Sequence, residues 1–410
     1  MDSARPDQLR LLVVVPFTPR VDAQHGGRVI AQFLMAASES HRIGLVYLRR
    51  NGGQSIDPAL AERCELVEEV EARSLLSGER PWQRRLQVLV SPLTGMPSPI
   101  RASYDGRLCE ALVRVARAWR PDVIQLEHDA LAQCAKVVRP LARATILVCH
   151  EPGLDAAREL ARTAEGRRRW AYRLDAWVWG RYWERHLPDV DAVVVFTDED
   201  RRALTAAAGG VRVVTIPLGI DLPGEPLDPH GSDATIAYVG GYQHLPNADA
   251  AVRLMRSIAP RIRQRVPSLR VSVVGAAPTD EMRSAASPQD DITGAVPTVA
   301  PYVNEAAVVV LPIRLGGGMR VKLLEALAAG KAVVASPRAA AGVGATPGVQ
   351  LELAETDDEF ADAVVTLLGD DDRRVALARN ARAWAVENLG WNSRVRSYDD
   401  LYRSLLTADA

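Results

Sequence analysis

The sequence has little lysine, and its charges nearly cancel. Of its 50 basic residues only three are lysines, Lys136, Lys322 and Lys331, and the formal net charge is −1. A near-neutral chain lacks the basic field that nucleic-acid binding requires, so we expect no nucleic-acid partner. The arginine bias is typical of a GC-rich genome, here expected to be bacterial, and it makes each lysine notable.

Cysteine and long apolar runs are also scarce. The four cysteines show no CxxC pairing, which favours reduced thiols over a disulfide framework or a zinc site. The first apolar run, from Leu11 to Val15, is far shorter than the ~20 residues that a membrane span needs. No signal-peptide pattern follows it. We therefore expect a cytoplasmic protein, and contact with the inner membrane surface stays open.

What is present is an α/β pattern that begins twice. The chain of 410 residues is 48% apolar and 25% charged, which suits a globular protein of two domains. A buried strand, a glycine-containing loop, a helix and a second strand start near residue 10 with "LRLLVVVPF" and again near residue 235 with "ATIAYVGG". Alternating strands and helices predict parallel sheets covered on both faces, hence two doubly wound domains.

The domain boundaries follow from composition. The stretch 216–233, "IPLGIDLPGEPLDPHGSD", is rich in proline and glycine, which is typical of a linker. We therefore predict a first domain over 1–215, a linker over 216–233 and a second domain over 234–390. The tail 391–410 is predicted to be helical.

One stretch combines glycines, cations and a helix start: "LGGGMRVKLLEALAAGKAVVAS", residues 315–336. It follows a strand ending at Pro312, and the helix is expected to begin near Arg320. Glycines let a ligand approach the backbone, and a helix N-terminus favours anions. Lys322 and Glu325 are three apart and share a helix face. The alternative is a plain turn before an amphipathic helix with solvated charges.

Several segments together resemble the family-four glycosyltransferases. The stretch 316–336 is similar to their donor-site segment. "YVGGYQHLPNADA" resembles the glycine loop that opens their C-terminal domain, and "IPLGID" resembles their linker motif, with Leu218 where asparagine is usual. "TGAVPTVAPYVNEAAVVVLP" and "FTDEDRRAL" resemble two further segments of the family. The resemblance extends over most of the chain.

This resemblance implies a fold and a reaction. The fold is GT-B, with two Rossmann-like doubly wound domains facing each other across a cleft and the last helix returning to the first domain. The reaction is retaining, metal-independent transfer of a hexose from a nucleoside diphosphate sugar to an acceptor hydroxyl or amine, with no further cofactor. UDP, GDP and TDP stay open as nucleotides. A polysaccharide, a lipid-linked molecule and a small natural product stay open as acceptors, and so does the oligomeric state.

The resemblance also assigns donor-site residues. Glu325 matches the glutamate that binds the ribose hydroxyls, and Arg320 and Lys322 match cations near the diphosphate. The family's other motif glutamate falls on Gly317, which leaves the donor sugar undetermined. The remaining donor-binding positions lie on glycine loops: Gly240, Gly241, Gly294, Gly316, Gly317, Gly318 and Met319.

Candidates on the acceptor side follow strands of the first domain. Gly26 and Gly27 match a loop near the diphosphate and acceptor, or form a plain turn before a helix. Glu127 and His128 end the strand in "PDVIQLEHDAL", and His150 ends the next strand, in "VCHEPG". A general base must reach the acceptor hydroxyl, and any of these three side chains could contact the reacting sugar. A histidine at a strand end is also commonly structural.

Two further patterns allow more than one interpretation. The segment 167–186, "RRRWAYRLDAWVWGRYWERH", fits either a core helix with snorkelling arginines, which we favour, or a surface that meets a lipid-linked or aromatic acceptor. The acidic runs 197–200 and 289–291 are expected to cap a helix or to lie in a solvated loop rather than to bind metal.

Three other functions would need different features. A dinucleotide oxidoreductase would need GxGxxG after a strand, and "VGGYQHLPN" lacks it. A sugar-nucleotide epimerase of the same fold would use the same donor site without an acceptor. A noncatalytic sugar-nucleotide binding protein would not need Arg320, Lys322 and Glu325 together.

Overall fold

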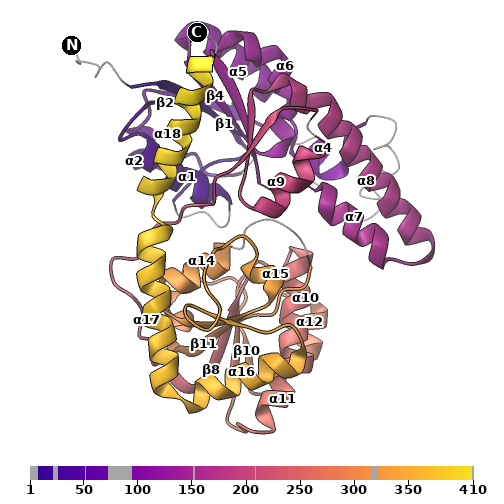
Figure 1. Ribbon diagram of the computed structural model, residues 1–410, viewed down its shortest axis with the longest axis vertical. Helices are drawn as coiled ribbons and strands as arrows, with labels where there is room; N and C mark the ends of the chain where they lie inside the picture. Colours follow the sequence, from indigo (N-terminus) through magenta and orange to yellow (C-terminus); the bar gives the residue numbers. More distant parts are fainter. Residues whose placement is uncertain are drawn as a thin grey trace. The chain divides into compact units, whose positions relative to one another are not determined.

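The structure is a computed structural model that describes residues 8–21, 26–50, 52–72, 95–150, 153–207, 209–315 and 321–408 (Figure 1). The chain forms two compact units. Unit 1 comprises Met1–Gly219 and Trp391–Ala410, and unit 2 comprises Ile220–Gly390. The first break, after Gly219, lies inside the stretch 216–233 that the sequence predicts as a linker.

Unit 1 is built on a seven-stranded parallel sheet with the order β3-β2-β1-β4-β5-β6-β7. The inner strands are continuous apolar runs because both faces of the sheet are covered. The strands are β1 (Arg10–Val15), β2 (Arg42–Arg49), β3 (Leu66–Glu71), β4 (Val123–Glu127), β5 (Ala144–Cys149), β6 (Ala192–Val195) and β7 (Arg212–Thr215).

Helices cover this sheet on both faces. Ile124 and Leu126 of β4 belong to the core beneath α5, α6 and α8, whereas Gln125 points to the opposite face and contacts α18, as alternation along a strand requires. The helices of unit 1 are α1 (Gly26–Ala37), α2 (Pro58–Ala61), α4 (Ser98–Ser103), α5 (Gly106–Trp119), η1 (Asp129–Leu131), α6 (Ala132–Val138), η2 (Arg139–Leu141), α7 (Leu154–Thr163), α8 (Gly166–His186), η3 (Leu187–Asp189), α9 (Asp198–Thr205) and α18 (Trp391–Ala408).

The last helix belongs to unit 1 although all of unit 2 precedes it in the chain. On α18, Trp391 and Tyr398 pack their rings against Phe33 of α1, with centroids 6.0 and 5.0 Å away. Tyr402 is buried beside β4. These aromatic contacts fix α18 to the sheet of unit 1.

Unit 2 is built on a six-stranded parallel sheet with the order β10-β9-β8-β11-β12-β13. Its strands are β8 (Ser232–Val239), β9 (Arg270–Val274), β10 (Asp290–Ile292), β11 (Ala306–Leu311), β12 (Ala332–Ala335) and β13 (Glu352–Leu353). Its helices are α10 (Leu245–Arg253), η4 (Leu254–Ile258), α11 (Ala259–Arg263), α12 (Asp280–Ala285), α13 (Ala300–Glu305), α14 (Val321–Ala328), α15 (Pro337–Ala340), α16 (Asp357–Gly369) and α17 (Asp371–Asn388).

The helical stretch from α10 to α11 is not a regular α-helix throughout. The helix contains a π-helical segment, η4, immediately before α11. Pro260 lies in the first turn of α11 and has no N–H to donate, and its ring would clash with the carbonyl four residues earlier. Widening the preceding turn relieves that clash, a usual origin of π-bulges.

Candidate functional site

The strand orders place most of the predicted residues near one point in each unit, although His150 follows the neighbouring strand β5 and Gly294 follows the edge strand β10. The order reverses between β1 and β4 in unit 1, and between β8 and β11 in unit 2. Open α/β sheets bind ligands at the carboxyl ends of strands at such switch points. Gly26 and Gly27 follow β1, and Glu127 ends β4. In unit 2, Gly240 and Gly241 follow β8, and the chain after β11 leads to Lys322 and Glu325.

The glycine loop after β8 makes a backbone contact that leaves no room for a side chain. Gly275, just after β9, has φ +137°, and a Cβ built there would lie 1.8 Å from the Gly240 carbonyl oxygen. The Gly240 amide donates to Val274 at 2.9 Å. The two glycines therefore fix the path of the loop at the ends of β8 and β9.

Gly275→Ala should lower the free energy of unfolding by about 3 kcal/mol or more, because the new Cβ must displace backbone atoms and adopt a strained φ. Gly348→Ala is the matched control, since Gly348 has φ +75° but nothing within 4 Å of its Cβ position. The control should cost only about 1 kcal/mol, the left-handed penalty alone. Urea unfolding of both variants measures the difference, and equal losses would contradict the backbone contact.

Asn247 joins this glycine loop to Lys322. Its side chain is only 3% exposed. Its Nδ2 donates to the Gly241 carbonyl at 2.8 Å, and its Oδ1 accepts from Lys322 Nζ at 3.1 Å. The orientation of the amide is determined, because a carbonyl can only accept and an ammonium can only donate. The lysine at the start of α14 is thus held beside the loop after β8.

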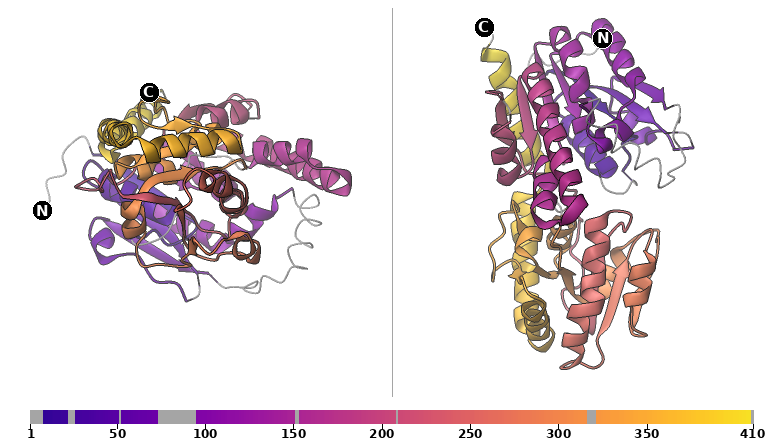
Figure 2. Two further views of the ribbon diagram at one scale, coloured as in Figure 1. Left: turned by 90° about the horizontal axis from the view of Figure 1, so that it is seen from below. Right: turned by 90° about the vertical axis from the view of Figure 1, so that its right-hand side faces the viewer.

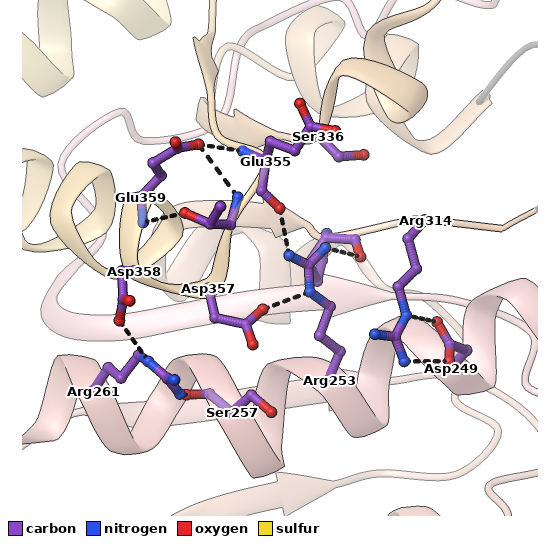
Figure 3. A network of polar contacts seen from close by, with 12 residues as sticks. Asp249, Arg253, Ser257, Arg261, Arg314, Ser336, Glu355, Asp357, Asp358 and Glu359 are labelled. Atoms are coloured by element: carbon purple, nitrogen blue, oxygen red, sulfur yellow. Dashed lines mark hydrogen bonds and ion pairs between the residues drawn. The ribbon is translucent and has the colours of Figure 1, made fainter.

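A second polar network anchors the chain after β11 (Figure 3). Arg253 is 8% exposed and donates to the Pro312 carbonyl at 3.1 Å. The same guanidinium donates to Asp357 and to the Glu355 carbonyl, both at 2.6 Å, and lies over the Phe360 ring at 5.2 Å. A buried guanidinium with these partners is a rigid support for the strand end.

Ile313 and Arg314, which follow Pro312 in the chain, are also held by hydrogen bonds. Ser336 donates its hydroxyl to the Ile313 carbonyl at 2.5 Å. Arg314 makes two hydrogen bonds to the Asp249 carboxylate, both at 2.8 Å (Figure 3). The peptide that leads into the glycine triplet is therefore held residue by residue up to position 314.

Five predicted donor-site residues lie outside the described residues: Gly316, Gly317, Gly318, Met319 and Arg320. The described part resumes at Val321, the first residue of α14. Lys322 and Glu325 are both half-buried on that helix, with the i, i+3 spacing that places them on one face. Gly294 follows β10 with φ +70° and open space around its Cβ position, as expected for a loop glycine.

In unit 1, four polar side chains form a chain of hydrogen bonds from α18 to the ends of β4 and β5. The Tyr402 hydroxyl donates to Gln125 Oε1. Gln125 Nε2 donates to Glu127 Oε1 at 2.5 Å, and Glu127 Oε2 bonds to His150 Nε2 at 2.7 Å. Both oxygens of Glu127 are therefore occupied, and the carboxylate orients the imidazole of His150.

His128 stands beside this hydrogen-bonded chain rather than in it. Its ring centroid is 6.1 Å from that of His150 and 6.3 Å from that of Phe17. Its backbone has φ +98°, which is rare for a residue with a side chain and tends to occur at functional sites. His128 Nδ1 accepts from the Ala130 amide at 3.3 Å.

Burial, together with the charges of His150 and Arg50, lowers the pKa of His128 from 6.5 to about 3. The ring is therefore neutral at pH 7. Because Nδ1 accepts, the proton of the neutral ring sits on Nε2. His128 can donate a hydrogen bond from Nε2, and its low pKa makes the ring a weak base.

His128→Asn should make the free energy of unfolding less dependent on pH. The unfolded chain binds a proton at this histidine near pH 6.5 and the folded protein only near pH 3, so stability falls as pH drops through that window. Asparagine tolerates positive φ and does not titrate. Urea unfolding between about pH 7 and pH 4.5 should give a shallower slope for the variant.

His41 and His186 will leave a residual slope in the variant, because burial lowers both of their pKa values as well. Identical slopes for the variant and the wild type would show that His128 does not titrate in this way.

The remaining predicted residues of unit 1 lie at the start of α1. Gly26 is its first residue, and a Cβ there would approach the Phe17 ring to 3.5 Å. Gly27 is buried and its carbonyl accepts from the Arg20 amide at 3.3 Å. The distance at Gly26 is an ordinary van der Waals contact, so the space there does not require a glycine, and the start of the helix lies beside the loop after β1.

The acidic run 197–200 caps a helix as expected, whereas for the run 289–291 the expected cap or solvated loop is wrong, because Asp290 and Asp291 lie in strand β10 and the side chain of Asp290 is buried. Thr197 caps α9 by accepting from the Asp200 amide at 3.1 Å. Asp290 forms an ion pair with Arg263 and accepts from the Ser287 amide at 2.7 Å. Among the residues that the structure describes, no cluster of three or more His, Cys, Asp and Glu side chains could hold a metal ion.

Several residues of these networks were not identified from the sequence, and the central ones are Asn247, Arg253, Gln125 and Tyr402. A signal existed for Gln125, since a polar residue inside the apolar strand "VIQLE" needs a partner when buried. Nothing local marks the other three, because their partners are distant in sequence.

Two family models match the chain in tandem. Residues 64–223 match "Glycosyltransferase Family 4", and residues 233–370 match "Glycosyl transferases group 1". Together they span well over half of the sequence. No curated protein sequence gives a significant match.

Solved structures give the same fold. Sucrose-phosphate synthase from Thermosynechococcus elongatus has a TM-score of 0.68 at 15% identity, over 97% of this chain and 100% of that one. Alr3699/HepE from Anabaena has a TM-score of 0.63 at 14% identity, again over 97% and 100%. A glycosyltransferase from Rickettsia africae has a TM-score of 0.62 at 12% identity, over 98% and 99%.

The likeness to these structures confirms the GT-B fold of two Rossmann-like domains. The tandem match of both halves identifies the enzyme: the chain belongs to the family-four glycosyltransferases.

Proposed function

We propose that this enzyme transfers a hexose from a nucleoside diphosphate sugar to an acceptor hydroxyl or amine, with retention of configuration and without a metal ion. The observation that carries the proposal is the position of Lys322. Its ammonium is fixed 3.1 Å from Asn247 Oδ1, and the glycine loop after β8 is fixed by the same amide. A diphosphate at this switch point would meet a cation and backbone N–H groups together.

The chemistry needs positive charge at this place. Breaking the anomeric C–O bond expels a nucleoside diphosphate, which gains negative charge as it leaves. Lys322 and Arg320 stabilise that charge in the transition state, which is the interaction that raises kcat. Glu325, on the same face of α14, accepts hydrogen bonds from the ribose diol.

On the acceptor side, the geometry favours His150 among the three candidates as the base. Glu127 has both oxygens engaged, so we assign it the role of orienting His150. A carboxylate bonded to Nε2 leaves Nδ1 as the accepting nitrogen of the neutral ring, the tautomer that a general base needs. His128, neutral with its proton on Nε2, is assigned as a hydrogen-bond donor to a sugar hydroxyl.

UDP is the first nucleotide to test. Crystals of the Anabaena protein contain UDP and glucose in one case and UDP-glucose in another. At 14% and 13% identity this likeness extends to the fold, so the nucleotide of the present enzyme is a proposal.

A thermal-shift panel tests the donor site. UDP, GDP, TDP and ADP, with their common sugar conjugates, are each added in the presence of EDTA. A ligand that binds only the native state raises the unfolding temperature. We expect a shift with one nucleotide and its sugar conjugate, and loss of that shift in Glu325→Ala.

Two results would overturn the proposal. The absence of a shift with any nucleotide would contradict the proposed donor site. A shift that requires a divalent cation would contradict metal independence. Product analysis then distinguishes the epimerase, which would convert the donor sugar with no acceptor present.

A further inference from the structure

The helical pair α7 and α8 of unit 1 is only partly covered. The two helices pack against each other and project from the sheet (Figures 1 and 2). The C-terminal half of α8 lies in the core, where Val178, Trp179 and Trp183 are buried. The core helix favoured from the sequence is therefore correct for this half and wrong for the half that precedes it.

The N-terminal half of α8 exposes a stripe of large apolar side chains. Trp170, Leu174 and Trp177 are 71%, 43% and 54% exposed. Their spacing of i, i+4 and i+7 places them on one face of the helix. Isolated exposed apolar residues are ordinary, but three on one face, two of them tryptophan, indicate a surface that meets something other than water.

Positive charge is concentrated on the same helix. Within Gly166–His186 the sequence has six arginines against two acids, in a chain whose net charge is −1. Arg169, Arg173, Arg181 and Arg185 are exposed. The Arg173 guanidinium lies over the Trp170 ring at 5.4 Å, so the charges border the apolar stripe directly.

We propose that the exposed face of α8 docks this enzyme on the surface of an anionic membrane. Tryptophan and leucine insert among headgroups and upper acyl chains, while arginines bind lipid phosphates, which is the usual division of labour in interfacial helices. The contact lies on the membrane rather than through it. Within the described residues, no helix is both long enough and apolar enough to cross a membrane.

The charges on α8 argue against a second copy of this chain as the partner that covers its exposed face. In a two-fold symmetric dimer the same patch meets itself. Arginines on α8 would then face arginines of the partner copy. Glu184 is the exposed acid of the helix, and it is already paired with Arg181 at 3.2 Å. An anionic lipid surface complements this patch, whereas a copy of the same helix repels it.

Vesicle co-sedimentation of the full chain tests the proposal. One set of vesicles contains phosphatidylcholine alone, and in the other about one third of the lipid is phosphatidylglycerol. We expect binding to the anionic vesicles only, reversed by high salt. Trp170→Ser combined with Trp177→Ser should weaken binding roughly tenfold or more.

The charge contribution is tested separately. Arg169→Gln combined with Arg173→Gln should weaken binding by roughly fivefold for each charge removed. Arg117→Gln with Arg379→Gln controls for net charge, since both arginines are exposed on other helices. Val386→Ser controls for the loss of an apolar residue, as Val386 is 51% exposed on α17 of unit 2. Both controls should bind like the wild type.

Three binding results would overturn the proposal: no binding of the wild type to anionic vesicles, equal binding to neutral ones, or unchanged binding by the double tryptophan variant. A concentration-dependent dimer that dissociates in the tryptophan variant would make a second copy the occupant. Circular dichroism confirms that each variant folds. The nucleotide thermal shift is independent of α8, so failure here leaves the proposed function untouched.

Discussion

Lys322→Ala should lower kcat by roughly ten- to a thousand-fold, the range expected for losing one group that stabilises charge in the transition state. Lys322 Nζ is fixed by Asn247 Oδ1 at 3.1 Å, so the cation is preorganised and does not need to be recruited during the reaction. Steady-state kinetics with the donor identified by thermal shift measures the change. KM for the acceptor should change little.

Two variants make the result specific. Lys136→Ala removes an exposed lysine from α6 of unit 1 and should leave kcat unchanged. Asn247→Ala keeps the cation but removes its support, and it should lower kcat by less than Lys322→Ala does. Wild-type turnover in Lys322→Ala would end the assignment of Lys322 to the diphosphate.

His150→Ala should lower kcat by roughly 10²- to 10⁴-fold, the usual contribution of a general acid–base group. The expectation rests on the 2.7 Å bond between His150 Nε2 and Glu127 Oε2, which holds the imidazole in one tautomer at the end of β5. Because this step involves a proton, the acid limb of the pH–rate profile should disappear in the variant.

The control and the positioning variant separate catalysis from structure. His230 also bonds a carboxylate, with Nδ1 at 3.0 Å from Asp371, but it lies in unit 2 before β8, and His230→Ala should keep full activity. Glu127→Gln should shift the pH profile and lower kcat by less than His150→Ala. If His150→Ala changes KM alone and leaves the profile intact, His150 binds substrate and is not the base.

Most of the architecture can be predicted from the sequence because it depends on local patterns of apolar residues, prolines and glycines. Buried strands such as Leu11–Val15 are continuous β-branched or aliphatic runs, and a parallel sheet covered on both faces requires such runs. The break after Gly219 falls in a stretch whose prolines and glycines suit neither a strand nor a helix. Local sequence is therefore sufficient to predict two doubly wound units.

The contacts within the sites were not predictable in the same way. Lys322 and Asn247 are 75 residues apart, and Tyr402 and Gln125 are 277 apart. No local periodicity specifies which of many polar side chains will meet across such separations. The sequence offers Glu127 and His150 as alternative candidates, and the different roles that we propose for them rest on the bonds from Gln125 to Glu127 and from Glu127 to His150 in the folded protein.

Helix α8 shows a second limit of prediction from sequence. Aromatic residues at helical spacing normally indicate a core face, and Trp179 and Trp183 follow that rule. Trp170 and Trp177 do not, because the helix projects beyond the sheet that covers its other half. The length of a helix relative to the sheet beneath it is a property of the assembled unit, and composition does not encode it.

The position of α18 has a consequence for the order in which a ribosome could produce a working enzyme. Unit 2 is a single uninterrupted segment, Ile220–Gly390, whereas unit 1 is completed by residues that follow it. Domains tend to fold as units during synthesis, so unit 2 can be finished while unit 1 still lacks a helix. Tyr402 then closes the hydrogen-bonded chain to His150 only after its own translation. A nascent chain stalled after unit 2 would contain all of unit 2 but would lack the tyrosine that bonds Gln125, so the network at the ends of β4 and β5 is completed only when α18 has been made.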